Sequence, residues 1–261
     1  MTGPQRRPII GGNWKMNTTL SEAVELAGAL AASLPPERWT EVVVFPPFTN
    51  LEAVRESLGE SRIGLGGQDV FWEERGAFTG EVSAEMLLSV GCKHVICGHS
   101  ERRHVIGESS EIVNRKVRSA LEGELKVILA IGETEVERHG GKTESVVSDQ
   151  LRRSLEDIPA EIMRDVVIAY EPVWAIGTGV TATPEQAQAA HAFVRLVLVE
   201  MYDDAVAEAT RIQYGGSVTA TNAPALLGCP DVDGALVGGA SLKPQEFAAI
   251  VGAQERILNG G

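Results

Sequence analysis

The sequence predicts an α/β protein built as a single (β/α)8 barrel, and three observations carry this prediction. Short apolar runs rich in β-branched residues recur along the chain, amphipathic stretches separate most of them, and polar or glycine-rich segments follow the runs instead of preceding them. Alternating strands and helices are typical of a parallel sheet. A length of 261 residues lies in the range in which one α/β barrel fills a single domain.

The apolar runs are numerous enough to close one barrel. As predicted strands they span residues 8–12, 41–45, 61–65, 93–97, 126–131, 165–170, 211–214 and 233–237. Predicted amphipathic helices span residues 20–34, 112–122, 145–155 and 184–201. The last helix has Thr183 at its cap and Pro184 at its first position, where both residue types are favoured.

A doubly wound open sheet is the alternative fold, but it seldom repeats so evenly in so short a chain. No linker rich in Pro, Ser or Gly divides the sequence, so we expect residues 1–261 to form one domain.

Charge and composition argue against several classes of function. The net charge of −13 disfavours binding of nucleic acid, whose phosphates require clustered Lys and Arg. No apolar stretch approaches the length of a membrane span and no secretory signal pattern is visible, so we expect a cytoplasmic protein that does not bind membranes. The cysteines form no CxxC pair, and His94, His99 and His104 do not align on one helix face, which gives no support for a metal site.

Polar residues follow several predicted strands at the point where each strand ends. Asn13 and Lys15 follow the first strand, His99 follows the fourth and Glu171 follows the sixth. The carboxyl ends of all strands in a barrel form one face, which brings distant parts of the sequence together. The sequence therefore predicts one pocket at this face.

Glu171 is the strongest catalytic candidate in this set. It ends a buried strand and leads into a loop that begins with Pro172 and contains Gly177 and Gly179. Proline stiffens one end of the loop and the glycines free the other, so the loop can move as a body and exclude water from a site beneath it.

Two glycine turns, Gly215-Gly216-Ser217 and Gly238-Gly239, follow the seventh and eighth predicted strands. We expect each turn to lead into a short helix, which would supply free backbone N–H groups and a positive helix end for a phosphate. The loops after these two strands are the usual phosphate site of a barrel. The alternative is that the glycines only turn the chain.

Lys15 and His99 each allow a structural as well as a functional interpretation. Lys15 alternates with Asn13 in an extended segment, so both side chains are expected on the same side. Taken alone, Lys15 could equally be a solvated loop cation, and an isolated histidine is more often structural. His99 is predicted at the start of a helical turn, which disfavours imidazolium, so we expect a neutral ring able to donate a proton to an oxyanion.

Three other catalytic motifs fail against the sequence. Gly98-His-Ser-Glu-Arg102 lacks the final glycine of a nucleophile elbow, and Gly141-Lys-Thr has Val136 where a P-loop requires glycine. The GxGxxA pattern of a dinucleotide-binding turn is matched by Gly177-Thr-Gly-Val-Thr-Ala182. This segment lies too far from the strand end to form the tight strand-to-helix turn that the motif requires.

Five motifs in the same order give the chain its resemblance to the triosephosphate isomerase family, nearly from end to end. They are Asn13-x-Lys15, Cys97-Gly-His-Ser-Glu-Arg-Arg103, Tyr170-Glu-Pro-Val-Trp-Ala-Ile-Gly-Thr-Gly179, Tyr214-Gly-Gly-Ser-Val218 and Leu236-Val-Gly-Gly-Ala-Ser-Leu242. The resemblance implies a TIM barrel that interconverts dihydroxyacetone phosphate and D-glyceraldehyde 3-phosphate in glycolysis and gluconeogenesis, with no cofactor and no metal.

The resemblance also implies a role for each candidate residue. Glu171 would carry a proton between neighbouring carbons, and neutral His99 would polarise the carbonyl and move protons between the oxygens. Lys15 would offset the phosphate and enediolate charge, and Asn13 would hydrogen-bond the oxyanion. Glu101 would hold these groups in place, with a part in a proton relay as the alternative. The phosphate would bind backbone N–H groups at Gly177, Ser217, Gly238 and Gly239.

The segment from residue 68 to residue 85 forms a long predicted loop with aromatic side chains, a type of loop that seldom remains in water. By resemblance it would dock into a second subunit of a homodimer, with Thr79 approaching the partner's Asn13 and the partner's Lys15. The alternative is a loop folded back on its own barrel.

The chain departs from the family pattern at three positions. Ala130 stands where Cys is common, Val180 replaces a frequent Lys in the mobile loop, and Asp69 stands where Asn is common. We expect effects on stability, loop motion and dimer strength. Two other functions are alternatives: an aldolase, which would need a Schiff-base lysine inside a strand where Lys126 only begins one, and a catalytically silent barrel, which would lack Glu171 or His99.

Overall fold

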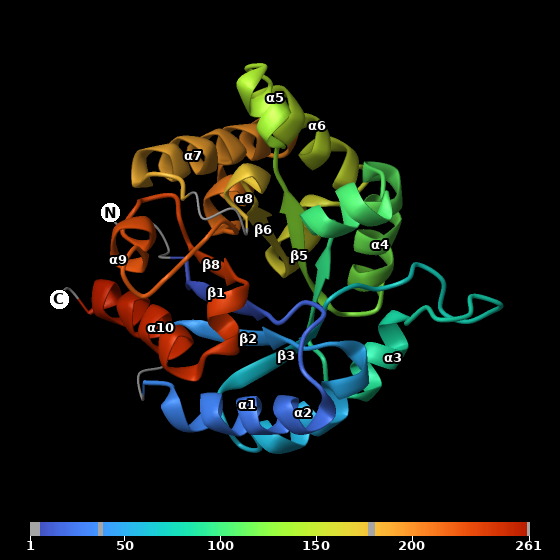
Figure 1. Cartoon of the computed structure of the whole chain (residues 1–261). Coiled ribbons are helices and arrows are strands. Elements are labelled where there is room, and N and C mark those ends of the chain that lie inside the picture. The colour runs from blue at the N-terminus through green and yellow to red at the C-terminus, as the bar shows by residue number, and fades with distance from the viewer. Residues whose placement is uncertain (1–5, 36–38, 177–180, 260–261) are drawn as a thin grey trace.

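The computed structural model describes residues 6–35, 39–176 and 181–259. Eight parallel strands pair in sequence order and close between the last and the first, which confirms the predicted barrel (Figure 1). The strands are β1 (Ile9–Asn13), β2 (Glu41–Phe45), β3 (Ile63–Gly67), β4 (His94–Cys97), β5 (Lys126–Ile131), β6 (Val166–Tyr170), β7 (Arg211–Tyr214) and β8 (Gly234–Val237).

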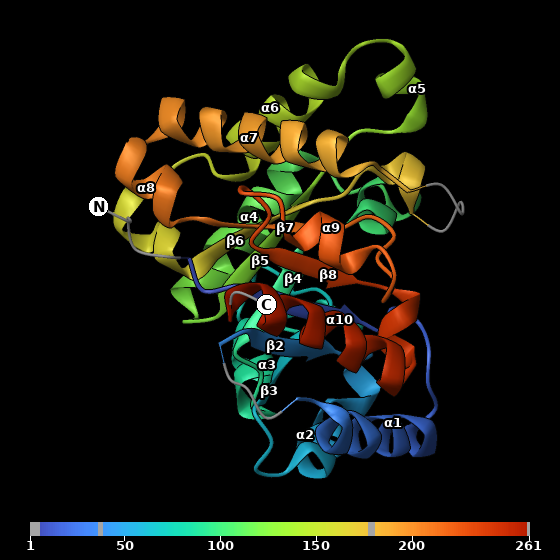
Figure 2. The same ribbon diagram turned by 90° about the vertical axis from the view of Figure 1, so that its left-hand side faces the viewer.

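Helices surround the barrel on its outer side, as the two perpendicular views show (Figures 1 and 2). The α-helices are α1 (Leu20–Ser33), α2 (Leu51–Leu58), α3 (Ala84–Ser89), α4 (Ser110–Glu122), α5 (Glu135–His139), α6 (Thr143–Ser154), α7 (Pro184–Met201), α8 (Asp204–Ala209), α9 (Ala223–Leu227) and α10 (Pro244–Leu258). Short turns of other helix types are η1 (Phe48–Asn50), η2 (Arg102–Ile106), η3 (Ala160–Asp165), η4 (Val173–Ala175) and η5 (Gly239–Leu242).

Helix α7 shows why the sequence rules work well for the longer helices. The Thr183 hydroxyl accepts a hydrogen bond from the Gln186 N–H at 3.2 Å, while the Gln186 side chain accepts one from the Thr183 N–H at 3.0 Å. This reciprocal cap and the proline at the first helical position fix the start of the helix where the sequence predicts it.

The strands read as continuous apolar runs because both of their faces are buried. One face points into the barrel, where Ile9, Val43, Phe45, Ile96, Ile128, Ala130, Val167, Ala169 and Leu236 form a separate core. Alternate residues such as Val44, Leu129 and Ile168 belong to the larger core between the strands and the helices. The two cores hold the carboxyl ends of the strands in fixed positions, and these ends carry the candidate site.

Strand β3 begins and ends two residues later than predicted. Its glycines belong to the strand because the barrel interior is occupied there: a Cβ on Gly66 would lie 2.3 Å from the Phe45 ring. The loop after β3 projects away from the barrel in Figure 1. Its aromatic rings partly cover one another, since the Phe71 ring centroid lies 4.0 Å from that of Trp72 and 4.7 Å from that of Phe78. None of the helices in the described part of the chain is long and apolar enough to cross a bilayer.

Candidate active site

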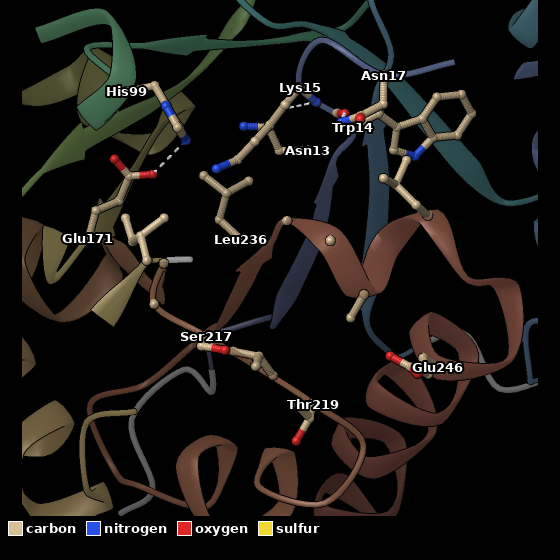
Figure 3. Close-up of a pocket in the computed structure, with 18 residues that line it drawn as sticks. Asn13, Trp14, Lys15, Asn17, His99, Glu171, Ser217, Thr219, Leu236 and Glu246 are labelled. Carbon is tan, nitrogen blue, oxygen red and sulfur yellow. Dashed lines mark hydrogen bonds and ion pairs between the residues drawn. The ribbon is translucent and has the colours of Figure 1, made fainter. Parts of the chain in front are cut away.

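The carboxyl ends of the strands surround a cavity of about 470 Å³. Of the residues predicted for the site, those that line this cavity are Asn13, Lys15, His99, Glu171, Ser217, Gly238 and Gly239 (Figure 3). Glu101 contacts Lys15 but does not line the cavity, and Thr79 lies in the exposed loop after β3. Gly177 lies outside the described residues, as do Gly179 and Val180.

Glu171 and His99 face each other across one side of the cavity (Figure 3). The distance from His99 Nε2 to Glu171 Oε1 is 3.1 Å. The other carboxylate oxygen, Oε2, accepts a hydrogen bond from the Ser100 N–H at 2.8 Å. Both side chains are almost fully buried, with 2% of Glu171 and 6% of His99 exposed. The carboxylate of the base candidate is therefore buried, in contact with one ring nitrogen and one backbone amide.

The hydrogen bonds of His99 define which ring nitrogen carries the proton. Its Nδ1 accepts a hydrogen bond from the Glu101 N–H at 3.2 Å, so Nδ1 is unprotonated. The ring N–H is then at Nε2, which lies 3.1 Å from Glu171 Oε1 in a residue that lines the cavity. A helical turn begins at the next residue, Ser100, as the sequence predicts. The role of His99 as a neutral donor to a ligand stays a prediction.

Lys15 reaches the cavity by a different route from the one the sequence suggests. The prediction of an extended segment is wrong, because the backbone at Lys15 has a φ of 54°, in the left-handed region that non-glycine residues rarely adopt. Three contacts hold it there: its N–H donates to Asn13 Oδ1 at 2.9 Å, its carbonyl accepts from Gln68 Nε2 at 2.8 Å, and its Nζ lies 2.6 Å from Glu101 Oε1. Strain of this kind is typical of functional positions.

The two glycine turns leave space for a ligand against the backbone. A Cβ on Gly215 would lie 2.7 Å from Glu171 Cγ, whereas a Cβ on Gly239 would meet no atom within 4 Å. A Cβ on Gly238 would lie 3.9 Å from Lys15 Nζ, so the cation lies beside the second turn. These turns and Lys15 together supply positive charge and unhindered N–H groups.

The two turns lead into different structures. The helix expected directly after Ser217 is not there, because α9 starts only at Ala223 and the Ser217 N–H instead donates to the Ala175 carbonyl at 3.2 Å. The helix expected after the second turn is found as η5, which begins at Gly239.

Glu133 is a functional candidate that sequence reasoning missed. It comes just after β5, is fully buried, and accepts hydrogen bonds from Tyr170 Oη at 3.0 Å and Trp174 Nε1 at 2.9 Å. The Arg138 guanidinium stacks over the Trp174 ring, 4.0 Å from its centroid. These contacts anchor the start of the loop after Glu171. The signal was present, since Glu133 is a carboxylate just beyond a strand end, like Glu171.

Two of the alternative chemistries lack their residues in the structure. Lys126 begins β5 at the end of the barrel opposite the cavity, and Lys15, which lines the cavity, follows β1, so neither is the lysine inside a strand that the aldolase alternative requires. Among residues 6–35, 39–176 and 181–259, no group of three His, Cys, Asp or Glu side chains is placed to hold a metal ion.

Comparison with known proteins places this arrangement in one family. The sequence matches the family model described as triosephosphate isomerase over residues 8–254. It is 52% identical to the triosephosphate isomerase of Chloroherpeton thalassium across 96% of this chain and 100% of the relative. The triosephosphate isomerase of Chloroflexus aurantiacus is 50% identical, and that of Moorella thermoacetica 52% identical, each across 94% of this chain and 98% of the relative.

Proposed function

Because the chain belongs to the triosephosphate isomerase family, we propose that Glu171 is the base of its reaction. The enzyme interconverts dihydroxyacetone phosphate and D-glyceraldehyde 3-phosphate by proton transfer through an enediolate, a step of glycolysis and gluconeogenesis. The observation that carries the proposal is the buried pair in which the Glu171 carboxylate and the His99 Nε2 N–H border the same cavity.

The two groups suit the two halves of the reaction. Glu171 removes a proton from the carbon next to the carbonyl and returns it to the neighbouring carbon, so no net proton is consumed. The Nε2 N–H of His99 donates to the carbonyl oxygen, where negative charge develops. A neutral imidazole can both give and take back a proton as the charge moves between the two oxygens.

Lys15 and Asn13 stabilise the same developing charge. Lys15 Nζ is close to the second glycine turn, so one cation can act on both the phosphate and the enediolate. The Oδ1 atom of Asn13 accepts the Lys15 N–H, which leaves the amide Nδ2 to donate to the oxyanion. Glu101 holds the Lys15 ammonium by the contact of 2.6 Å.

The phosphate binds to backbone N–H groups of Ser217, Gly238 and Gly239, and of Gly177 beyond the described residues. For Ser217 to take part, its hydrogen bond to the Ala175 carbonyl must break. Ala175 lies at the start of the loop after Glu171, so phosphate binding and loop movement are coupled through this bond.

Closure of residues 172–182 protects the enediolate from losing its phosphate. A chain shortened within this loop should lose isomerase turnover and release more methylglyoxal per turnover. Methylglyoxal is measured by a coupled glyoxalase assay, and the protective role is wrong if the shortened chain releases no more than the wild type.

The base assignment is tested with purified protein in EDTA and without added cofactor. Fast conversion of D-glyceraldehyde 3-phosphate is expected from the wild type, and a Glu171→Gln variant should lose about three orders of magnitude in kcat because the amide cannot accept the proton. Glu246→Gln is the matched control, since Glu246 is also a carboxylate at the cavity but lies far from His99 in Figure 3. Activity retained by Glu171→Gln would exclude Glu171 as the base.

We also propose that residues 1–261 fold as one domain and act as a homodimer in the cytoplasm, where glycolytic substrates are found. Support for the dimer comes from exposed apolar side chains on the segments after β1, β3 and β4, with Met16 96%, Phe78 41% and Val105 79% exposed. The loop of residues 68–83 would then bring Thr79 to the partner's Lys15. Sedimentation at micromolar concentration should give a dimer for the wild type and a monomer for Phe78→Glu; a monomeric wild type contradicts the dimer.

A further inference from the structure

Arg103 lies beneath the turn that carries His99, on the side away from the cavity. Its Nε donates to the Gly98 carbonyl at 2.8 Å and to the Ala130 carbonyl at 3.3 Å, and one terminal nitrogen donates to the Ala130 carbonyl at 3.2 Å. The guanidinium thus ties the turn after β4 to the end of β5. Arg103 does not line the cavity, so it cannot touch the substrate.

The remaining donors of Arg103 also go to neutral groups. They reach the hydroxyl of Ser110 on α4 and that of Ser154 on α6, each at 3.2 Å. Within the described parts of the chain, no carboxylate forms an ion pair with Arg103; the nearby Glu108 is occupied by Arg102 and Lys116. A half-buried guanidinium held only by carbonyls and hydroxyls keeps its positive charge uncompensated at close range.

The turn is built around this guanidinium. Gly98 has a φ of 73°, and a Cβ at Gly98 would lie 2.7 Å from a terminal nitrogen of Arg103 and 3.1 Å from the Ala130 carbonyl oxygen. The next two residues along the turn supply both contacts of the Glu171 carboxylate, from the His99 ring and the Ser100 N–H. A displacement of the guanidinium would therefore displace the groups that hold the base.

We propose that Arg103 is a positioning residue for the isomerase reaction, which fixes the turn of residues 98–100 against Glu171. The inference rests on the proposed roles of Glu171 and His99.

A purely structural role is the competing explanation, since Arg103 also joins α4 and α6. Such a role would lower thermal stability and the amount of folded enzyme, but it would leave kcat and KM of the folded enzyme unchanged. Charge and fork geometry can be separated, because lysine retains the charge without the fork and glutamine retains a donor without the charge.

The test compares Arg103→Gln and Arg103→Lys with the wild type in kcat, KM and thermal unfolding. Both variants should lose about 10- to 100-fold in kcat with KM nearly unchanged, because the turn shifts while the phosphate site does not.

Arg153→Gln is the matched control, because Arg153 is an exposed arginine on α6 paired with Glu111 and Asp149, and the change removes the same charge. It should leave every kinetic quantity at the wild-type value. Wild-type kcat in Arg103→Lys or in folded Arg103→Gln would overturn the proposal; if Arg103→Gln does not fold, the kcat of Arg103→Lys decides. Glu171→Gln is assayed in parallel, so that a failure of the base assignment is seen separately.

Discussion

A glutamate and a histidine meet at each end of the barrel, at the same distance but with different partners. At the carboxyl ends of the strands, His99 Nε2 lies 3.1 Å from Glu171 Oε1. At the amino ends, His94 Nε2 lies 3.1 Å from Glu41 Oε1. Both histidines are buried, and all four residues stand at the end of a strand or just beyond it.

The third partner of each carboxylate makes the difference. The second oxygen of Glu41 accepts a hydrogen bond from the Arg211 guanidinium at 2.5 Å. Burial alone would raise the pKa of Glu41, but the contact with His94 and the hydrogen bond and charge of Arg211 outweigh it and hold the pKa well below its usual range. The second oxygen of Glu171 instead meets a backbone N–H, and the glycine at 215 leaves space beside its side chain.

The comparison shows that a buried Glu–His pair is not in itself a catalytic site. Pairing with the Arg211 guanidinium keeps the Glu41 carboxylate ionised, which suits a residue that closes the amino end of the barrel. At the other end, the Glu171 carboxylate contacts an imidazole ring and a backbone N–H, and glycine turns leave space beside it, which suits the proton exchange proposed for Glu171. Substitutions at the two ends of the barrel should therefore have opposite effects on activity and on stability.

The largest difference is expected between the two histidines. His99→Asn should lower kcat by about two to three orders of magnitude, because the donor to the carbonyl oxygen is lost. His94→Asn should keep kcat within about twofold and lower the unfolding temperature instead, because it removes one partner of a buried pair. Steady-state kinetics and calorimetry on both variants check this. A comparable loss of kcat in the two variants would mean that the ends of the barrel are not functionally distinct.

The barrel itself could be predicted because its signals are local. Strands β2, β5 and β7 occur at the predicted residues, and β2 and β5 are apolar runs, after one charged residue each, that are buried on both faces. The rule that carboxyl ends of strands converge then places Asn13, His99 and Glu171 around one cavity. No side-chain contact was needed for either step.

The rest of the site depends on partners that are distant in the sequence. The left-handed backbone of Lys15 is held by Gln68, and lysine carries no intrinsic preference for that conformation, so no local rule predicts it. The Ser100 N–H is invisible in a sequence because every residue but proline has one. Glu133 could have been found by the rule that found Glu171, but its partners Tyr170 and Trp174 are defined only by the fold.

The pair of Glu41 and His94 should affect how the stability of the folded protein depends on pH. The pKa of Glu41 is lowered in the folded state relative to an ordinary value of 4.5, so its stabilisation is complete above that pH and is lost as the pH falls below it. Glu41→Gln should therefore be less stable than the wild type by about 2–3 kcal/mol at pH 7, and this difference should shrink as the pH falls from about 5 to 3. Denaturant unfolding at several pH values measures it. A difference that does not change with pH would show that Glu41 contributes by packing alone.

A third carboxylate, that of Asp69, has its pKa shifted in the opposite direction from that of Glu41. Asp69, where the family commonly has Asn, lies at the base of the loop after β3, with both oxygens 2.7 Å from Lys116 Nζ and one 2.9 Å from Arg102. Burial raises the pKa of Asp69 to about 6, against the attraction of Lys116 and Arg102 and with the added repulsion of Glu108. At the amino end of the barrel, one carboxylate, Glu41, pairs with one guanidinium. At the base of the loop after β3, Asp69 and Glu108 both contact Lys116 and Arg102.

Because the folded-state pKa of Asp69 lies above its ordinary value of 3.8, the ionised side chain costs stability above about pH 6, and that cost disappears as the pH falls toward 4. Asp69→Asn should therefore gain stability relative to the wild type on going from pH 4 to pH 8, by at most about 2–3 kcal/mol. Asp149→Asn, an exposed carboxylate on α6, is the control whose difference from wild type should stay small at both pH values. A constant difference for Asp69→Asn would mean that Lys116 and Arg102 fully compensate the buried charge, and the cluster would then resemble the Glu41 pair at the amino end of the barrel.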